Sequence, residues 1–180
     1  SDLSGRCPLG GAVHREGRSL SDRIVRRNAR TYKRAKFYAD RFFPKAVPMD
    51  FTAARKVMVD SQVRVNDVTD RALQAALLVV PRERFCDPER AFAAYAEAPV
   101  QIAGDRRLME ARDVAKLLQA LDVREGERAL AIAAPYAAAV LQRMKAVVTA
   151  QEADQAVMDV VAPALADEGV QTVVAPLDQP

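Results

Sequence analysis

The sequence predicts an α/β protein with a parallel sheet of about three strands, preceded by helices and by a basic amphipathic helix near the N-terminus. Half of the 180 residues are apolar and 28% are charged, which is the balance of a globular protein. After Gly126, strand-like runs alternate with helical segments. This alternation is typical of parallel strands joined by right-handed helical crossovers.

Charge divides the chain unevenly. Residues 1–48 contain 12 Lys and Arg against 4 Asp and Glu, whereas residues 49–180 contain 15 against 20. Such a split indicates parts with different tasks. We predict a basic extension with one amphipathic helix at residues 1–48, a helical part at 49–122 and a βαβαβ unit at 123–180. Met49 is typical of a natural protein start.

The basic extension is expected to form a helix from Ser21, a capping residue, to the residue before Pro44. Its arginines and lysines surround an apolar stripe with aromatic members, which needs a surface to cover it. The helix can fold back onto the acidic remainder of the chain, dock through residues 20–43 onto a protein partner or larger complex, or bind nucleic acid or an anionic membrane. The candidate partner-binding residues are Tyr32, Phe42, Phe43, Arg26, Arg30 and Arg34.

The helical part contains three predicted helices. Residues 50–60 form the first, and the second runs from a cap at Asp67 or Thr69 to about Val80, where Pro81 ends it. Loops and short helical turns are expected up to Pro99. The third helix covers residues 110–121. Its inward side chains are predicted to be Val114, Leu117, Leu118 and Leu121.

The βαβαβ unit begins with a strand at residues 128–132 and a helix at 136–144. A second strand is predicted at 146–149. The helix after it covers residues 152–168, bent near Pro163 and closed by Gly169. Residues 170–175 form the third strand. A three-stranded sheet of this kind has an apolar edge that needs a cover.

Several segments form a set of motifs in a fixed order: residues 58–70, 80–85, 95–96, 118–121, 126–128 and 136–141. Together they resemble the protein-L-isoaspartate O-methyltransferase family. The resemblance covers residues 49–175 and does not extend to residues 1–48. It implies a Rossmann-like sheet that binds S-adenosylmethionine, and an enzyme that methylates the free carboxylate of isoaspartyl residues. The family's sheet normally has seven strands, so a partial, C-terminally short member is expected here.

The family's cofactor loop is rich in glycine, because a Cβ atom would prevent close approach of the backbone to the cofactor. Here the corresponding positions are Ala133, Ala134 and Pro135, and the proline also removes one N–H donor. The carboxylate that holds the ribose hydroxyls matches Gln151, and Glu152 follows it at the predicted start of the helix. The resemblance therefore implies a degenerate cofactor site.

Met109 stands where the family has a serine that contacts substrate and cofactor, so no catalytic residue is assigned. We expect a pseudo-enzyme without a cofactor, acting as a structural or accessory subunit of a larger assembly. Two alternatives stay open. In the first, the family function survives and the chain is an S-adenosylmethionine-dependent methyltransferase of isoaspartyl residues. In the second, the basic extension makes the chain a binding module for nucleic acid or anionic membrane.

The remaining candidate sites have simpler explanations. Cys7 and His14 are too few for a metal site, so no metal is expected. The carboxylates at 60, 67 and 70 are interpreted as helix caps and solvated charges, and residues 82–84 as a solvated charged turn. No secretory signal or long apolar run is found, which predicts a cytoplasmic location, including the cytoplasmic side of a larger complex.

Overall fold

The computed structural model describes residues 49–176. The chain divides into two units, Ser1–Pro48 and Met49–Pro180, and the described residues belong to the second. The predicted helix of the basic extension, with its aromatic and arginine candidates, lies outside the described residues. Its role in partner binding stays a prediction.

The described part begins with a helical segment longer than predicted. Helix α2 (Phe51–Met58) is capped by Asp50, whose Oδ1 accepts hydrogen bonds from the N–H groups of Thr52 and Ala53, both at 3.0 Å. One π-helical turn (Val59–Val63) and one 3-10 turn (Arg64–Asn66) continue it. The segment ends at Asp67, which adopts a left-handed conformation with φ of 61°.

Helix α3 (Arg71–Val79) starts later than the sequence indicated. Asp70 is its N-cap, because its Oδ1 accepts hydrogen bonds from the N–H groups of Ala72 and Leu73 at 2.8 and 3.1 Å. The prediction of a cap at Asp67 or Thr69 was wrong. The left-handed turn at Asp67 closes the preceding helix, so the side chain that can reach the first turn of α3 is Asp70.

Two 3-10 turns, Arg82–Phe85 and Pro88–Ala93, follow α3. A short antiparallel hairpin then forms from β1 (Val100–Ala103) and β2 (Arg106–Leu108). This hairpin was not predicted. β1 has four residues and β2 three, which is at or below the shortest run in which alternation can be read.

Helix α4 (Ala111–Leu121) confirms the third predicted helix but not its inner face. Val114 and Leu118 are buried, whereas Leu117 and Leu121 are 55% and 65% exposed. The prediction that all four point inward was therefore wrong for two. The spacing of apolar residues shows which side chains share one face of the helix. How many of them are buried depends on which other elements pack against that face.

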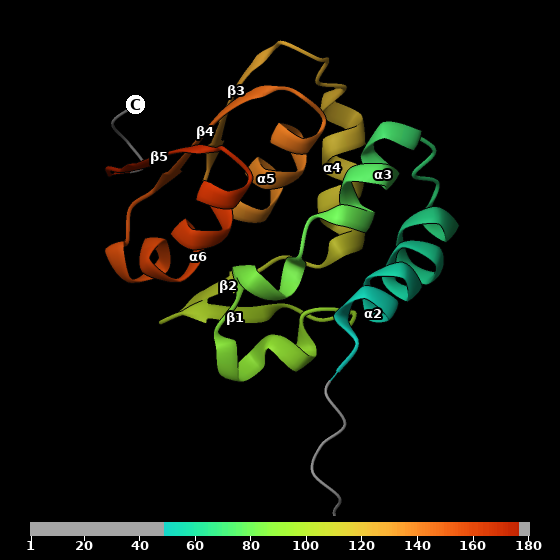
Figure 1. Cartoon of the computed structure of the whole chain (residues 1–180), viewed down its shortest axis with the longest axis horizontal. Coiled ribbons are helices and arrows are strands. Elements are labelled where there is room, and N and C mark those ends of the chain that lie inside the picture. The colour runs from blue at the N-terminus through green and yellow to red at the C-terminus, as the bar shows by residue number, and fades with distance from the viewer. Residues whose placement is uncertain (1–48, 177–180) are drawn as a thin grey trace, which may run out of the picture. The chain divides into compact units, whose positions relative to one another are not determined.

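The α/β fold class and its parallel three-stranded sheet are confirmed. Strands β3 (Arg128–Ile132), β4 (Val147–Glu152) and β5 (Gln171–Val174) pair in the order β3-β4-β5, all parallel. Helices α5 (Pro135–Arg143) and α6 (Gln155–Asp167) connect them and contact the sheet. Figure 1 shows these helices beside the sheet, with α4 and α3 next to α5.

The end of β4 differs from the prediction in a way that matters for the site. The strand runs on to Glu152, which pairs with Val174 of β5. Helix α6 begins only at Gln155, because Asp154 caps it by accepting a hydrogen bond from the N–H of Ala156 at 2.8 Å. The predicted helix start at residue 152 was wrong, and Glu152 is a strand residue.

The two faces of the sheet have different surroundings. The face that carries Val148, Ala150 and Glu152 is buried. The opposite face carries apolar side chains that are exposed in the described part of the chain. Because parallel sheets are normally covered on both faces, this second face is a candidate contact surface. Its large apolar residues are Leu130, Ile132, Val147 and Val173.

Candidate functional site

The candidate site is centred on the loop between β3 and α5, at the carboxyl ends of the strands. Ala133 continues the sheet by donating its N–H to the carbonyl of Gln151 at 2.9 Å. It then turns the chain with φ of 54°, a left-handed conformation that favours glycine. Ala134 is the N-cap without a side-chain cap, and Pro135 is the first residue of α5. The loop thus keeps a glycine-type turn without a glycine.

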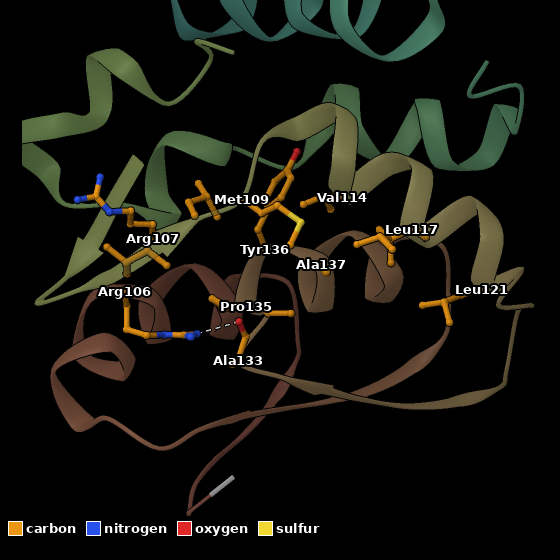
Figure 2. Close-up of a pocket in the computed structure, with 14 residues that line it drawn as sticks. Arg106, Arg107, Met109, Val114, Leu117, Leu121, Ala133, Pro135, Tyr136 and Ala137 are labelled. Atoms are coloured by element: carbon orange, nitrogen blue, oxygen red, sulfur yellow. Dashed lines mark hydrogen bonds between the residues drawn. The ribbon is translucent and has the colours of Figure 1, made fainter. Parts of the chain in front are cut away.

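A cavity of about 310 Å³ adjoins this loop. Its wall is mainly apolar and comes from three places: the exposed side of α4, the β1–β2 hairpin, and the loop with the start of α5. Figure 2 shows Leu117, Leu121 and Val114 of α4 facing the region of the loop. The cavity therefore joins segments far apart in the sequence at the end of the sheet where ligands of α/β proteins bind.

Arg106 of β2 crosses from the hairpin to the loop (Figure 2). Its Nη2 donates to the carbonyl oxygen of Ala133 at 2.8 Å and lies 3.2 and 3.4 Å from the two carboxylate oxygens of Glu152. One nitrogen thus donates hydrogen bonds both to the loop and to the side chain at the end of β4. The Nε of Arg106 is buried and has no hydrogen-bond partner in the described structure.

Glu152 is the carboxylate that faces this loop. Its side chain is only 3% exposed and forms an ion pair with Arg106. Burial raises the pKa of Glu152, and the neighbouring Arg106 opposes that rise without cancelling it. Gln151, the position that the family resemblance pointed to, lies on the other face of β4 and donates its side-chain N–H to the carbonyl of Pro176 at 2.8 Å.

The alternation of strand side chains explains this difference. Residues that follow each other in β4 point to opposite faces, so a shift of one residue decides whether a carboxylate or an amide is on the side of the loop. From the sequence we matched the position to Gln151, because the helix was predicted to begin at Glu152. A longer predicted strand would have favoured Glu152.

Met109 lies between β2 and α4 and lines the cavity. Its side chain is exposed, and its carbonyl oxygen accepts a hydrogen bond from Nη2 of Arg82. A thioether is at most a weak hydrogen-bond acceptor and has no proton to give or take near neutral pH. This position therefore supplies no acid, base or hydroxyl nucleophile.

Arg82 and Tyr136 form a buried pair behind the loop that the sequence did not reveal. Arg82 is fully buried, its Nε donates to the carbonyl of Ala94 at 2.7 Å, and its guanidinium carbon lies 4.9 Å from the ring centre of Tyr136. Burial lowers the pKa of Arg82 and raises that of Tyr136 to about 12. The interpretation of residues 82–84 as a solvated turn was wrong for Arg82. A buried cation in a charged run has no signature in a single sequence.

The acidic residues before α3 are explained by their local bonds. Asp60 pairs with Arg64 on the same helical segment, and Asp70 is the cap of α3. Within residues 49–176, no three His, Cys, Asp or Glu side chains come together as a metal site would require. The same residues contain no helix that is long and apolar enough to span a membrane.

The buried carboxylate predicts a pH dependence of stability. Because burial raises the pKa of Glu152, the folded protein holds this proton more tightly than the unfolded chain does. Stability due to this group is therefore present below the ordinary pKa of glutamate and is lost as the pH rises through the raised value. Glu152→Gln removes the titration and should remove this loss.

Urea unfolding of the wild type and of Glu152→Gln between pH 4 and pH 8 measures the effect, since titration of the other carboxylates is common to both proteins. The free energy of unfolding of the wild type should fall relative to the variant as the pH rises. A relative gain with rising pH would mean that Arg106 stabilises the charged carboxylate more than burial disfavours it.

Comparison with known proteins places this site in a known scaffold. The family model for protein-L-isoaspartate(D-aspartate) O-methyltransferase matches residues 53–162. Protein-L-isoaspartate O-methyltransferase 1 of Rhodopseudomonas palustris (strain HaA2) is 37% identical over 118 residues, which is 64% of this chain and 48% of the relative. The enzyme of Methylorubrum populi is 39% identical over 102 residues, or 56% of this chain and 48% of the relative. The chain thus spans about half the length of the curated relatives it matches.

Solved structures support the fold. A putative protein-L-isoaspartate O-methyltransferase of Plasmodium falciparum, in complex with S-adenosyl-L-homocysteine, superposes with a TM-score of 0.59 at 14% identity, over 69% of this chain and 64% of that one. A second protein-L-isoaspartate O-methyltransferase gives a TM-score of 0.52 at 18% identity, over 68% of this chain and 41% of the other. At these identities the likeness concerns the fold.

Proposed function

This chain belongs to the protein-L-isoaspartate O-methyltransferase family, and we propose that it is a non-catalytic member that acts as a structural or interaction subunit of a larger assembly. The observation that carries the proposal is the loop between β3 and α5. Ala133 makes the turn, and Pro135 is the first residue of α5. The carbonyl oxygen of Ala133 already accepts a hydrogen bond from Arg106.

The residues of this loop do not fit a nucleoside-type cofactor such as S-adenosylmethionine. A backbone that closes around a ligand needs glycines or free N–H groups, and residues 133–136 have neither glycine nor an N–H at Pro135. The N–H of Ala133 is used within the sheet. The loop therefore offers fewer backbone donors, and less room for close approach of a cofactor, than a glycine-rich loop does.

The residues at the expected reacting centre also support a non-catalytic role. Methylation of a carboxylate needs a group that orients the substrate oxygen beside the methyl donor. At the position of the family's serine, Met109 offers a thioether. The neighbouring carboxylate, Glu152, is buried and paired with Arg106. Asp154, which follows β4, is exposed, but its carboxylate caps α6 by accepting a hydrogen bond from the N–H of Ala156.

The exposed face of the sheet supports an interaction role. Leu130, Ile132, Val147 and Val173 lie on one face of three neighbouring parallel strands and are exposed in residues 49–176. Apolar surface gathered in this way marks a contact with another segment or another protein. Docking through residues 20–43 and the cytoplasmic location stay predictions from the sequence.

Calorimetric titration of the full chain with S-adenosylmethionine tests the non-catalytic role. We expect no saturable heat at ligand concentrations up to about 1 mM, the range of very weak binding. An assay of methyl transfer to an isoaspartyl peptide should give no product. One-to-one binding at micromolar strength with product formation would contradict the proposal, and isolation of the protein from its native cells with a stable partner would support it.

One observation favours the alternative that the chain is an active methyltransferase. Glu152 ends β4 on the same side as the loop, and a carboxylate there could accept both hydroxyls of a ribose. The titration and the methyl-transfer assay separate this alternative from the non-catalytic one. Binding of nucleic acid or anionic membrane by the basic extension concerns residues outside the described part and stays a prediction.

A further inference from the structure

We propose that Arg106 determines what the carboxyl ends of β3 and β4 can bind, because its guanidinium excludes a nucleoside from Glu152 and from the loop at Ala133. The inference deepens the proposed function and rests on it in one respect: it names the residue that keeps S-adenosyl compounds out. Arg106 is then a specificity-determining residue of this site.

The geometry supplies the first argument. A ribose held at this end of the sheet would use the carboxylate of Glu152 as its acceptor and would lie against the backbone of the loop. Nη2 of Arg106 lies within 3.4 Å of both carboxylate oxygens and 2.8 Å from the carbonyl of Ala133. The guanidinium therefore occupies the space between the two groups that a nucleoside would have to reach.

Electrostatics supplies the second argument. The side chain of Glu152 is almost completely buried, and Arg106 is the cation paired with it among the described residues. A ribose is uncharged, so its hydroxyl groups could replace the hydrogen bonds of Arg106 but not its charge. A hydroxyl group that donates to a carboxylate also forms a charge-assisted hydrogen bond, so the difference between the two ligands is the positive charge of Arg106. Displacement of Arg106 by a nucleoside would leave a buried carboxylate without a counter-ion, which opposes binding.

The contacts also show that Arg106 is held by this site rather than by its own hairpin. Each hydrogen bond found for its guanidinium goes to Ala133 or Glu152, on segments that follow β3 and end β4. Its buried Nε has no partner in the described residues. Removal of the guanidinium should therefore free the site while leaving the pairing of β1 with β2 intact.

The test is calorimetric titration of the full chain with S-adenosyl-L-homocysteine. Arg106→Gln keeps a polar side chain but removes the charge and the reach to Glu152. Arg107→Gln is the matched control. Arg107 is the next residue of the same strand, has no ion pair among residues 49–176, and points away from Arg106 (Figure 2).

We expect no saturable heat for the wild type and for Arg107→Gln, and binding at least about tenfold tighter for Arg106→Gln, which corresponds to about 1.4 kcal/mol. If Arg106→Gln binds no better than the wild type, Arg106 is not the excluding residue. If the wild type binds as tightly as Arg106→Gln, the exclusion is also refuted. Methyl transfer to an isoaspartyl peptide by the wild type would instead refute the proposed function, which separates the two failures.

A second pair of variants covers the case in which Arg106→Gln does not fold because Glu152 has lost its counter-ion. Glu152→Gln and the double variant Arg106→Gln with Glu152→Gln leave no unpaired buried carboxylate, and a glutamine oxygen can still accept a ribose hydroxyl. The double variant should bind S-adenosyl-L-homocysteine several-fold more tightly than Glu152→Gln, because only Arg106 differs between them. Equal affinities would overturn the proposal.

Discussion

Arg82→Ala is expected to lower the free energy of unfolding by about 3 kcal/mol, because hydrogen bonds from a charged donor contribute about 1.5–3 kcal/mol each and relief of the buried cation offsets part of the loss. The guanidinium donates to the carbonyls of Ala94 and Met109 and packs on the ring of Tyr136. Alanine leaves both carbonyls without this donor, that of the fully buried Ala94 included, and opens a cavity beside Tyr136. Urea unfolding followed by circular dichroism measures the change.

Two further variants separate the causes. Arg82→Met fills most of the space and should recover the part of the loss that comes from the cavity. Arg84→Ala is the matched control in the same turn: its ion pair with Asp167 involves side chains that are 42% and 63% exposed, so a change below about 1 kcal/mol is expected. A loss for Arg82→Ala as small as that for Arg84→Ala would show that the buried guanidinium contributes little.

Glu83→Ala is expected to destabilise the protein by about 2–3 kcal/mol, since removal of one partner of a buried ion pair leaves the other charge uncompensated. The side chains of Arg55 and Glu83 are 11% and 13% exposed, with Nη2 and Oε1 3.3 Å apart. Tyr95 joins them by donating to Glu83 and accepting from Nε of Arg55 at 3.0 Å. Burial and the bond to Glu83 raise the pKa of Tyr95, so its hydroxyl stays a donor.

This cluster holds α2, which carries Arg55, against the turn at residues 82–85, and Arg55 also donates to the carbonyl of Val79 at 3.1 Å. Because Arg55 keeps its bond to Val79 when Glu83 is removed, the expected loss of stability is smaller than the largest losses seen when a buried ion pair is broken. Asp60→Ala, which breaks the exposed pair with Arg64, is the control and should change stability by less than about 1 kcal/mol. Equal unfolding midpoints for Glu83→Ala and Asp60→Ala would contradict the prediction.

The elements with strong local signals could be predicted. The alternation after Gly126 predicted β3, α5 and β5 closely, because apolar runs and glycine or proline boundaries are local features. The cap of α3 and the start of α6 were placed wrongly by one to three residues, since several nearby Asp and Thr residues can each act as a cap. The hairpin of β1 and β2 was missed because its strands are too short to show a period.

The candidate site was predictable only in outline. The absence of glycine at Ala133 and Pro135 and the methionine at position 109 are properties of the sequence. The partnership of Arg106 with Glu152 is not, because 46 positions separate them in the chain and neither stands in a recognisable pattern. An arginine in a short strand next to another arginine gives no sign of which one turns toward the sheet.

The sequence by itself determined the class of fold, the order of the strands and helices after Gly126, and the absence of glycine from residues 133–136, since these follow from residue type and spacing along the chain. Only the tertiary structure decided that Glu152 rather than Gln151 faces the loop, that Arg106 binds it, and that Arg82 is buried against Tyr136. These contacts depend on strand register and on the meeting of distant segments. Burial then shifts the pKa of Glu152, Arg82 and Tyr136, and the burial of a side chain depends on how the whole protein packs.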